Sequence, residues 1–160
     1  QGLGSIGRPV AETLRKRGVE IVASDLLPFT DFESISSDKI YETPCDLFSP
    51  CATGGVLDET TIPKLRCKIV CGGANNPLAT EPDAERLREK GILYIPDFIS
   101  NSGATIEGAS RAIGEEARIE SRFAAIPGLV GEILEEAYRI KRSPHFVATS
   151  WADTRISERR

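Results

Sequence analysis

Hydrophobic residues in the first hundred positions are grouped in short runs, each of which ends at residues typical of turns. The runs at 19–25, 45–49, 68–71 and 92–95 contain clusters of apolar residues that do not alternate with polar ones. This pattern is typical of parallel strands buried on both faces, so it predicts four such strands. Between the first two, the polar segment 27–40 is expected to be a crossover, for which no regular structure is predicted.

Helical signals separate these strands. A helix is predicted from residue 7 to Gly18, because apolar residues recur there near helical spacing and glycine commonly ends helices. A second helix is predicted over 82–90, with proline in its first turn and Gly91 at its end, and a short helical turn is expected at 61–65. The alternation of strands and helices predicts a doubly wound parallel α/β sheet with right-handed crossovers.

From about Thr105 onward the pattern becomes mainly helical. Two apolar stripes are predicted, which consist of Ile106, Ala109, Ile113 and Ala117, and of Val130, Ile133, Leu134, Ala137 and Tyr138. Pro127-Gly128 predicts a break or kink between the two helices, and Ser143-Pro144 predicts the end of the second. Residues 151–160 are charged and are expected to form a terminal helix.

The composition is that of an ordinary globular domain. The 160 residues are 40% hydrophobic and 28% charged, and the formal net charge of −4 gives no reason to expect a nucleic-acid partner. No stretch approaches the roughly 20 apolar residues of a membrane span, so no membrane partner is expected either.

The cysteines give no indication of a metal site. Cys45, Cys51, Cys67 and Cys71 contain no C-x2-C pair, and His145 is the one histidine in the sequence. We therefore expect four buried thiols in a cytoplasmic protein and no bound metal.

The most informative motif is the glycine-rich turn Gln1-Gly2-Leu3-Gly4-Ser5-Ile6-Gly7. Its G-x-G-x-x-G spacing is typical of dinucleotide binding: Gly2 makes the tight turn, Gly4 lets the backbone approach a pyrophosphate, and Gly7 lets the helix pack closely on the sheet. The phosphates would lie at the helix N-terminus. Because such a turn follows a strand, we expect a Rossmann-type sheet whose first strand is missing. The lack of any methionine agrees with an internal piece of a longer chain.

The strand predicted at 19–25 ends in Asp25, where a carboxylate would bind both hydroxyls of an adenosine ribose. A carboxylate there repels a 2′-phosphate, and Leu26 and Leu27 follow with no nearby arginine, so NAD is favoured over NADP. The alternative is that Asp25 is only a turn residue before Pro28.

Distinctive loops follow the other three predicted strands, at 49–55, 72–78 and 96–104. Ligands of open α/β sheets lie at the carboxyl ends of the strands. Small residues let the backbone approach a flat ring, and the side chains of Asn76 and Asn101 offer both a donor and an acceptor, which suits a carboxamide. The alternative is that glycine and asparagine merely form turns.

Three segments also resemble a known family. The segments 45–52 (CDLFSPCA), 74–76 (ANN) and 94–98 (YIPDF) resemble the NAD-binding domain of the Glu/Leu/Phe/Val dehydrogenases, and the short connections resemble its leucine, phenylalanine and valine branch. The resemblance implies oxidative deamination of an L-amino acid to a 2-oxo acid and ammonia, with hydride transfer to NAD. It also implies a homo-oligomer, and an upstream substrate domain, absent here, that carries the catalytic lysine and aspartate.

The resemblance also implies roles for individual residues. Asn76 would lie beside the nicotinamide ribose or carboxamide, Asn101 would face the nicotinamide and the substrate, and Thr105 would line the substrate pocket with Asn101. The implied cofactor contacts are Gly2, Leu3, Gly4, Ser5, Ile6, Gly7, Asp25, Leu26, Cys51, Ala52, Ala74, Asn76 and Asn101. No catalytic residue is expected in this chain.

Some positions depart from the family pattern. Residues 100–104 read Ser-Asn-Ser-Gly-Ala, where the family usually has Ile-Asn-Ala-Gly-Gly, and Thr53 and Pro77 stand where leucine and glutamine are common. These departures leave the amino acid substrate open. They also leave two alternatives: a dehydrogenase of the same fold that acts on another substrate such as a hydroxy acid, and a non-catalytic domain that senses NAD.

Overall fold

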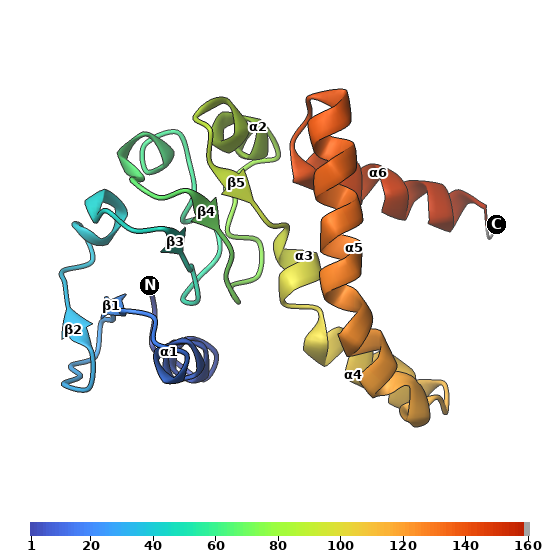
Figure 1. Ribbon diagram of the computed structural model, residues 1–160, viewed down its shortest axis with the longest axis horizontal. Helices are drawn as coiled ribbons and strands as arrows, with labels where there is room; N and C mark the ends of the chain where they lie inside the picture. Colours follow the sequence, from blue (N-terminus) through green and yellow to red (C-terminus); the bar gives the residue numbers. More distant parts are fainter. Residues whose placement is uncertain (159–160) are drawn as a thin grey trace.

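The strands of the structure are parallel to their neighbours, as the apolar runs of the sequence predict. The computed structural model describes residues 1–158 and contains two sheets (Figure 1). In the first, β1 (Val22–Ala23) pairs with β2 (Glu33–Ser34). In the second, the order is β3 (Leu47–Phe48), β4 (Ile69–Val70) and β5 (Leu93–Tyr94). The ordered strands are shorter than the predicted runs that contain them.

The elements between the strands agree with the predicted alternation. They are α1 (Gly7–Lys16), η1 (Ile40–Glu42), η2 (Ile62–Lys64) and α2 (Pro82–Glu89). The predicted helices before β1 and before β5 and the helical turn before β4 are therefore confirmed. Strand β2 lies in the polar segment for which no structure was predicted. Its two residues are exposed, and Phe32 just before it is buried.

Glycines end both helices of this region, as the sequence predicts. Gly18 and Gly91 have φ angles of +82° and +78°, a left-handed conformation that other residues rarely adopt. The amide of the next residue turns back to a carbonyl in the last helical turn, at 3.1 Å for Val19 and 2.9 Å for Ile92. This turn sends the chain directly from each helix towards the following strand.

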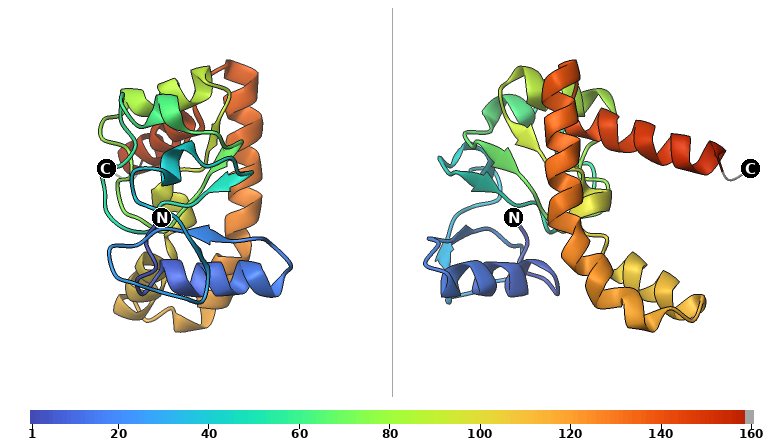
Figure 2. Two further views of the ribbon diagram at one scale, coloured as in Figure 1. Left: turned by 90° about the vertical axis from the view of Figure 1, so that its left-hand side faces the viewer. Right: turned by 45° about the vertical axis from the view of Figure 1, so that its right-hand side comes forward.

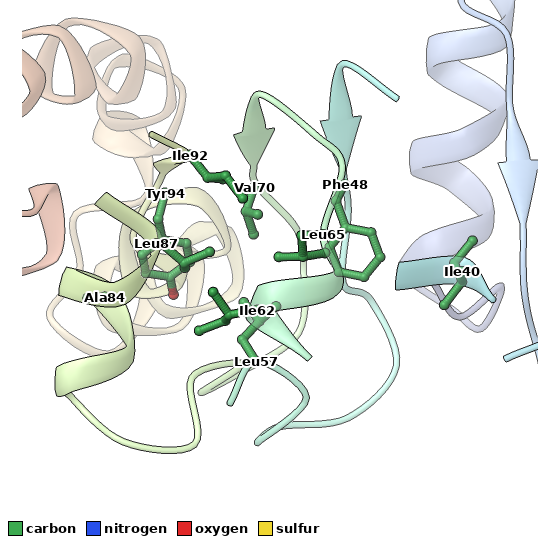
Figure 3. Packing of buried hydrophobic residues seen from close by; sticks show 10 residues of the cluster. All are labelled: Ile40, Phe48, Leu57, Ile62, Leu65, Val70, Ala84, Leu87, Ile92 and Tyr94. Atoms are coloured by element: carbon green, nitrogen blue, oxygen red, sulfur yellow. The ribbon is translucent and has the colours of Figure 1, made fainter. Parts of the chain in front are cut away.

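The main hydrophobic core lies between the three-stranded sheet and the elements that connect its strands (Figure 3). Val70 of the central strand is fully buried and pairs with Phe48 on one side and Tyr94 on the other. The cluster consists of Ile40, Phe48, Leu57, Ile62, Leu65, Val70, Ala84, Leu87, Ile92 and Tyr94. The buried strands carry the loops that follow them on a rigid base.

Helices make up the rest of the chain. They are α3 (Asp97–Ser100), α4 (Gly103–Ala112), η3 (Glu116–Arg118), α5 (Ile119–Ile140) and α6 (Pro144–Ser157). Helix α5 packs against α4 and α6, and α6 packs against α2 and β5. Figure 2 shows α6 pointing away from the sheets. Among residues 1–158, no helix is both long enough and apolar enough to cross a membrane.

The predicted stripe from Ile106 to Ala117 is wrong. Helix α4 ends at Ala112, and Gly114 has a φ of +72°, so the chain turns and helical spacing does not continue. Ile113 is 65% exposed, and Ala109 and Ala117 are exposed as well.

The second predicted stripe, on α5, is only partly right. Ile133 and Ala137 are buried and pack against Val147 and Ala148 of α6. Tyr138 is 89% exposed, because it lies beside the buried face of α5 and not on it.

Two helix boundaries differ from the prediction. Pro127 does not break the helix, since α5 continues through it, and the bend of α5 agrees with the predicted alternative of a kink (Figure 1). Helix α5 already ends at Ile140, and Ser143 begins α6 instead, because its hydroxyl accepts a 3.2 Å hydrogen bond from the Phe146 amide. The predicted terminal helix therefore starts at Pro144, and its residues 159–160 lie outside the described residues.

The two sheets are separated by a slot. Gln1 lies between them: its amine donates to the Ser49 carbonyl (3.0 Å), and its carbonyl accepts from the Cys51 amide (2.8 Å). On the other side, the Gly2 amide donates to the Ser24 carbonyl (2.7 Å). Residues 1–2 thus bridge the ends of β1 and β3, in the place of the strand that the sequence predicts to be missing (Figure 1).

A cavity of about 530 Å³ extends from Gln1 along this slot. Apolar side chains of α1, β1 and β3 line it, among them Val10, Leu14, Val22 and Leu47. Val10 and Leu47 are each 37% exposed, although the sequence pattern places both in a core. Their exposure has a simple cause, because nothing in residues 1–158 covers the slot.

The expectation of four buried thiols is wrong in part. All four cysteines are free, but Cys45 is exposed and the other three are half-buried. Cys45 is among the residues that line the slot. Burial raises the pKa of the Cys67 thiol to about 11.

We predict that Ile133 and Tyr138 differ sharply in their effect on stability. Ile133→Ala should lower the free energy of unfolding by about 2–5 kcal/mol, because it removes a buried side chain and leaves a cavity. Tyr138→Ala, on the same helix, should change it by less than about 0.5 kcal/mol. Chemical denaturation measures both values. Equal losses of the free energy of unfolding in the two variants would contradict the orientation of α5, in which Ile133 is buried and Tyr138 is exposed.

Candidate functional site

The loops that follow β3 and β4 interlock through their backbones. The Gly55 amide donates to the Asn76 carbonyl (2.8 Å), and the Ala74 amide donates to the Pro50 carbonyl (3.0 Å). A Cβ atom on Gly72 would overlap the same Pro50 carbonyl oxygen. Small residues in these loops therefore allow a close approach of backbones, which larger residues would prevent.

Side chains tie the segment after β5 to the β4 loop. The Ser100 hydroxyl donates to the Gly72 carbonyl (3.0 Å), and the Asn101 amide nitrogen donates to Oδ1 of Asn75 (2.7 Å). The structure thus brings the three predicted strand-end loops together at one edge of the sheet. The side chain of Asn101 is therefore bound to another residue of the protein, Asn75.

Asp97 holds the β4 loop at a second point. One carboxylate oxygen accepts from the Asn76 amide (2.8 Å), and the other accepts from the Tyr94 hydroxyl (3.0 Å). Burial, with the nearby charge of Asp97, raises the pKa of Tyr94 far above its usual value, so the phenol remains a donor. Asp97 is itself buried, with 8% exposure.

The glycine turn packs against the loop after β3. Gly2 has a φ of +86°, and a Cβ atom there would lie 2.8 Å from Ala52. A Cβ on Gly7 would overlap the Gly2 carbonyl oxygen, whereas a Cβ on Gly4 would meet no atom within 4 Å. Gly2 and Gly7 are thus required by the fold itself. Gly4 is exposed, and nothing in the described protein explains the need for glycine there.

Asp25 fixes the other side of the turn. Its carboxylate accepts hydrogen bonds from the amides of Leu3 (2.6 Å) and Leu27 (2.9 Å). These two bonds, that to Leu27 first, hold the pKa of Asp25 below its usual value, so it is ionised at neutral pH. Since a carboxylate has about four lone-pair positions, two positions are left for further donors.

The N-terminus of α1 lies beside this turn with its positive end free. The cap residue Ile6 makes no side-chain hydrogen bond to the helix, and no acidic residue occurs in the first turn. Unpaired N–H groups and the helix dipole at such an end attract anions. Arg8 is half-buried there and forms an ion pair with Asp31.

The remaining predicted residues differ in exposure. Ser5 and Ile6 of the turn are exposed, Cys51 is half-buried, and Ala74 of the β4 loop is buried. Leu26 is 94% exposed, and Thr105 is exposed in the first turn of α4. No contact in the described structure distinguishes Thr105 as part of a pocket.

The comparison with known families agrees with this geometry. A family model described as Glutamate/Leucine/Phenylalanine/Valine dehydrogenase matches residues 8–110. This chain belongs to that family. The family predicted from three short segments is thereby confirmed, and the matched residues include all three strand-end loops.

Several dehydrogenases of the family are similar over nearly the whole chain. Phenylalanine dehydrogenase of Caldalkalibacillus thermarum is 33% identical over 99% of this chain and 47% of that enzyme. Leucine dehydrogenase of Thermoactinomyces intermedius is 33% identical over 99% of this chain and 45% of that enzyme. The chain therefore spans about half the length of the curated relatives it matches.

A solved structure from the family shows the same fold. The crystal structure of L-tryptophan dehydrogenase from Nostoc punctiforme superposes with a TM-score of 0.90 and 32% identity, over 99% of this chain and 50% of that one. The predicted α/β Rossmann-type fold with a helical C-terminal region is confirmed.

Two residues of this candidate site were not expected from the sequence. Asp97 and Asn75 were recognised only as parts of motifs, yet both bind across loops. The signal for Asp97 in the sequence is a carboxylate two residues after the apolar run at 92–95. Its partner, a backbone amide 21 residues earlier, cannot be read from sequence.

We predict that two glycines of the turn differ in their tolerance of alanine. Gly7→Ala should lower the free energy of unfolding by more than about 2 kcal/mol, because the new methyl group displaces a backbone carbonyl. Gly4→Ala should change it by less than about 0.5 kcal/mol, since it meets open space. Thermal unfolding of both variants checks this. A stable Gly7→Ala variant would contradict the observed close approach.

Proposed function

We propose that this chain is the cofactor-binding part of an NAD-dependent L-amino-acid dehydrogenase. The reaction would transfer a hydride from the amino acid α-carbon to the nicotinamide, and hydrolysis of the imino acid would give a 2-oxo acid and ammonia. The observation that carries the proposal is the junction of the glycine turn and three strand-end loops in a member of this family. The names of similar proteins support the amino acid substrate class.

The turn and α1 would bind the pyrophosphate of the cofactor. The α1 N-terminus is free of acidic residues and side-chain caps, and the open position of Gly4 leaves space for a phosphate against the backbone. Residues Leu3, Ser5 and Ile6 would contribute the remainder of the turn.

Asp25 would bind the adenosine ribose and favour NAD over NADP. Its ionised carboxylate has two acceptor positions free and would repel a 2′-phosphate. Leu26 follows Asp25 directly in the sequence. The Cys51–Ala52 segment lies against the turn, because Gly2 closely approaches Ala52. They would form the adenosine side of the site.

Asn76 and Asn101 would bind the nicotinamide half. Both lie at the carboxyl end of the sheet, on loops that are hydrogen-bonded to each other, and the Asn101 amide also donates to the Ala74 carbonyl (3.4 Å). Asn101 and Thr105 would face the amino acid. Catalytic lysine and aspartate residues would come from another domain, in a cytoplasmic homo-oligomer.

The slot between β1 and β3 supports a longer protein. We propose that an apolar strand preceding Gln1 fills it and pairs in parallel with both neighbours, which would join the two sheets. Hydrogen exchange measures this directly. The amides of β1 and β3 should exchange faster in the 160-residue chain than in the complete polypeptide, and equal rates would exclude the strand.

A second function is favoured by one observation. The Asn101 side chain, which would face the substrate, is bound to Asn75, in a segment that departs from the family pattern. An amide that is already hydrogen-bonded within the protein is less available to a substrate. This favours a domain that binds NAD without turnover.

We predict that Asp25 controls both affinity for NADH and its preference over NADPH. In the complete polypeptide, Asp25→Ala should weaken NADH binding by about tenfold or more, because hydrogen bonds to a charged group are lost. The ratio of the NADPH dissociation constant to the NADH dissociation constant should fall, because no carboxylate then repels the 2′-phosphate. Gly4→Ala should weaken NADH binding without loss of stability.

Fluorescence titration measures these affinities, and Glu33→Ala is the matched control. Glu33 is an exposed acid of β2, which pairs with β1, and its loss should leave the preference for NADH over NADPH unchanged. If the unaltered polypeptide binds no NADH, the proposed cofactor is wrong.

We also predict where turnover occurs. The complete polypeptide should reduce NAD with at least one member of a panel of L-amino acids, and residues 1–160 alone should be inactive with all of them, because the catalytic groups lie elsewhere. NADH production at 340 nm is the measurement. Activity of residues 1–160 would overturn this assignment, and binding without turnover by the complete polypeptide would favour the sensing domain.

A further inference from the structure

We propose that Asp97 is a positioning residue, which holds the backbone of residue 76 so that the Asn76 side chain faces the cofactor. This inference rests on the proposed function. It assigns a role to a buried carboxylate that touches neither the glycine turn nor the Asp25 region.

Asn76 has an unusual backbone conformation that needs support. Its φ is +49°, and it is one of two non-glycine residues with positive φ in residues 1–158. Asparagine tolerates this region better than most residues, but at a cost. The cost is met by hydrogen bonds at both ends of the residue: its amide donates to Asp97 (2.8 Å), and its carbonyl accepts from Gly55 (2.8 Å). The side chain itself is exposed and free to bind a ligand.

Asp97 connects this strained residue to the core. Its other oxygen accepts from the hydroxyl of Tyr94, which is 2% exposed and belongs to the main hydrophobic cluster. Tyr94 is a residue of β5, so its ring cannot move without disturbing the sheet. The position of the Asn76 amide is thus set by a chain of two hydrogen bonds from a buried strand.

The direction of these bonds distinguishes positioning from helix capping. Asp97 is the first residue of α3, where a carboxylate commonly accepts from amides of its own helix. Here both carboxylate oxygens instead accept from groups outside α3, on the β4 loop and on β5. The side chain therefore serves the neighbouring loop and not its own short helix.

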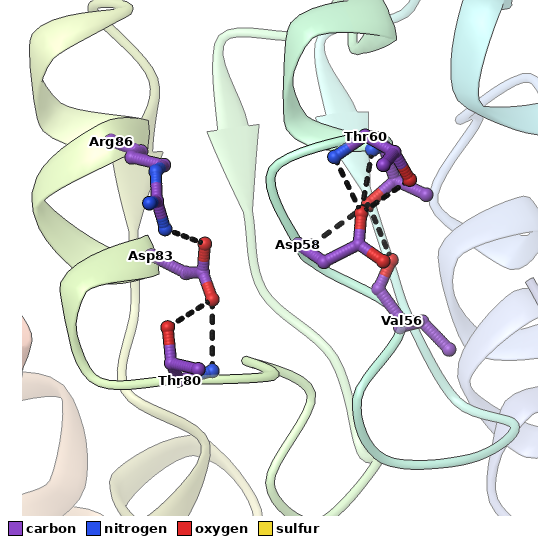
Figure 4. Close-up of polar contacts among 7 residues, drawn as sticks. Val56, Asp58, Thr60, Thr80, Asp83 and Arg86 are labelled. Carbon is purple, nitrogen blue, oxygen red and sulfur yellow. Dashed lines mark hydrogen bonds and ion pairs between the residues drawn. The ribbon is translucent and has the colours of Figure 1, made fainter.

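Asp83 offers a matched control, because it is a second buried carboxylate that binds a loop amide (Figure 4). It accepts from the amide (2.8 Å) and hydroxyl (2.7 Å) of Thr80 and from Arg86 (2.6 Å). These contacts lie at the start of α2, and none of them involves the strand-end loops. Asp83→Asn should therefore cost stability without affecting a cofactor.

The test is a double-mutant cycle on the complete polypeptide, with NADH as the probe. Asp97→Asn should weaken NADH binding by about tenfold, because the charged acceptor is lost and the new NH2 group must face either the Asn76 amide or the Tyr94 hydroxyl, both of which donate to Asp97. Asn76→Gly removes the side chain that Asp97 positions and accepts positive φ freely. In that background Asp97→Asn should weaken binding less than about twofold further. Asp83→Asn should leave affinity unchanged.

Each outcome has a definite meaning. The inference is wrong, while the proposed function stands, if Asp97→Asn binds NADH with the affinity of the unaltered protein. It is equally wrong if Asp97→Asn lowers the affinity by the same factor in the Asn76→Gly background as in the unaltered protein, because the two residues would then act independently. Should Asp97→Asn fail to fold, Tyr94→Phe decides: it removes one donor from the carboxylate, and a loss of affinity that disappears in the Asn76→Gly background supports the proposal. If the unaltered polypeptide binds no NADH, the proposed function itself fails.

Discussion

The close approach of backbone to backbone at the carboxyl ends of the parallel strands is the constraint on which this structure depends. A Cβ atom on Gly7 or Gly72 would overlap a backbone oxygen, and one on Gly54 would lie 2.9 Å from the carbonyl oxygens of Asn75 and Asn76. Because the strands are parallel, all their loops emerge at one edge, where only small residues let them interlock. The same approach leaves amides and exposed asparagine side chains at that edge.

Much of this fold follows from local pattern. The apolar runs locate the strands, and Gly18 and Gly91 mark where two helices end, because a left-handed residue is needed there. The glycine turn and the order of the strand-end motifs were sufficient to identify the family before any contact was known. These features depend on residues close in sequence, whose chemistry fixes their conformation.

The rest depends on contacts between distant residues, which a periodic pattern does not contain. Tyr138 fits a helical stripe but points to solvent, because only the position of α6 determines which face of α5 is buried. Val10 and Leu47 fit a core that residues 1–158 leave open. The bond from Asp97 to the Asn76 amide joins segments 21 residues apart, and no spacing rule predicts it.

The slot and the candidate cofactor site share the same residues, and this has a thermodynamic consequence. Gln1 pairs with the segment after β3, while Gly2 pairs with the segment after β1 and makes the tight turn. A strand in the slot would continue through these residues into the turn, so the pairing that joins the sheets would also fix the backbone of the glycine turn. A ligand that binds only the ordered turn must then stabilise the sheet by the same linkage. Sheet completion and cofactor binding are in this sense linked equilibria. At this junction the glycines divide the two roles, because the fold itself requires Gly2 and Gly7, whereas Gly4 faces open space beside the turn.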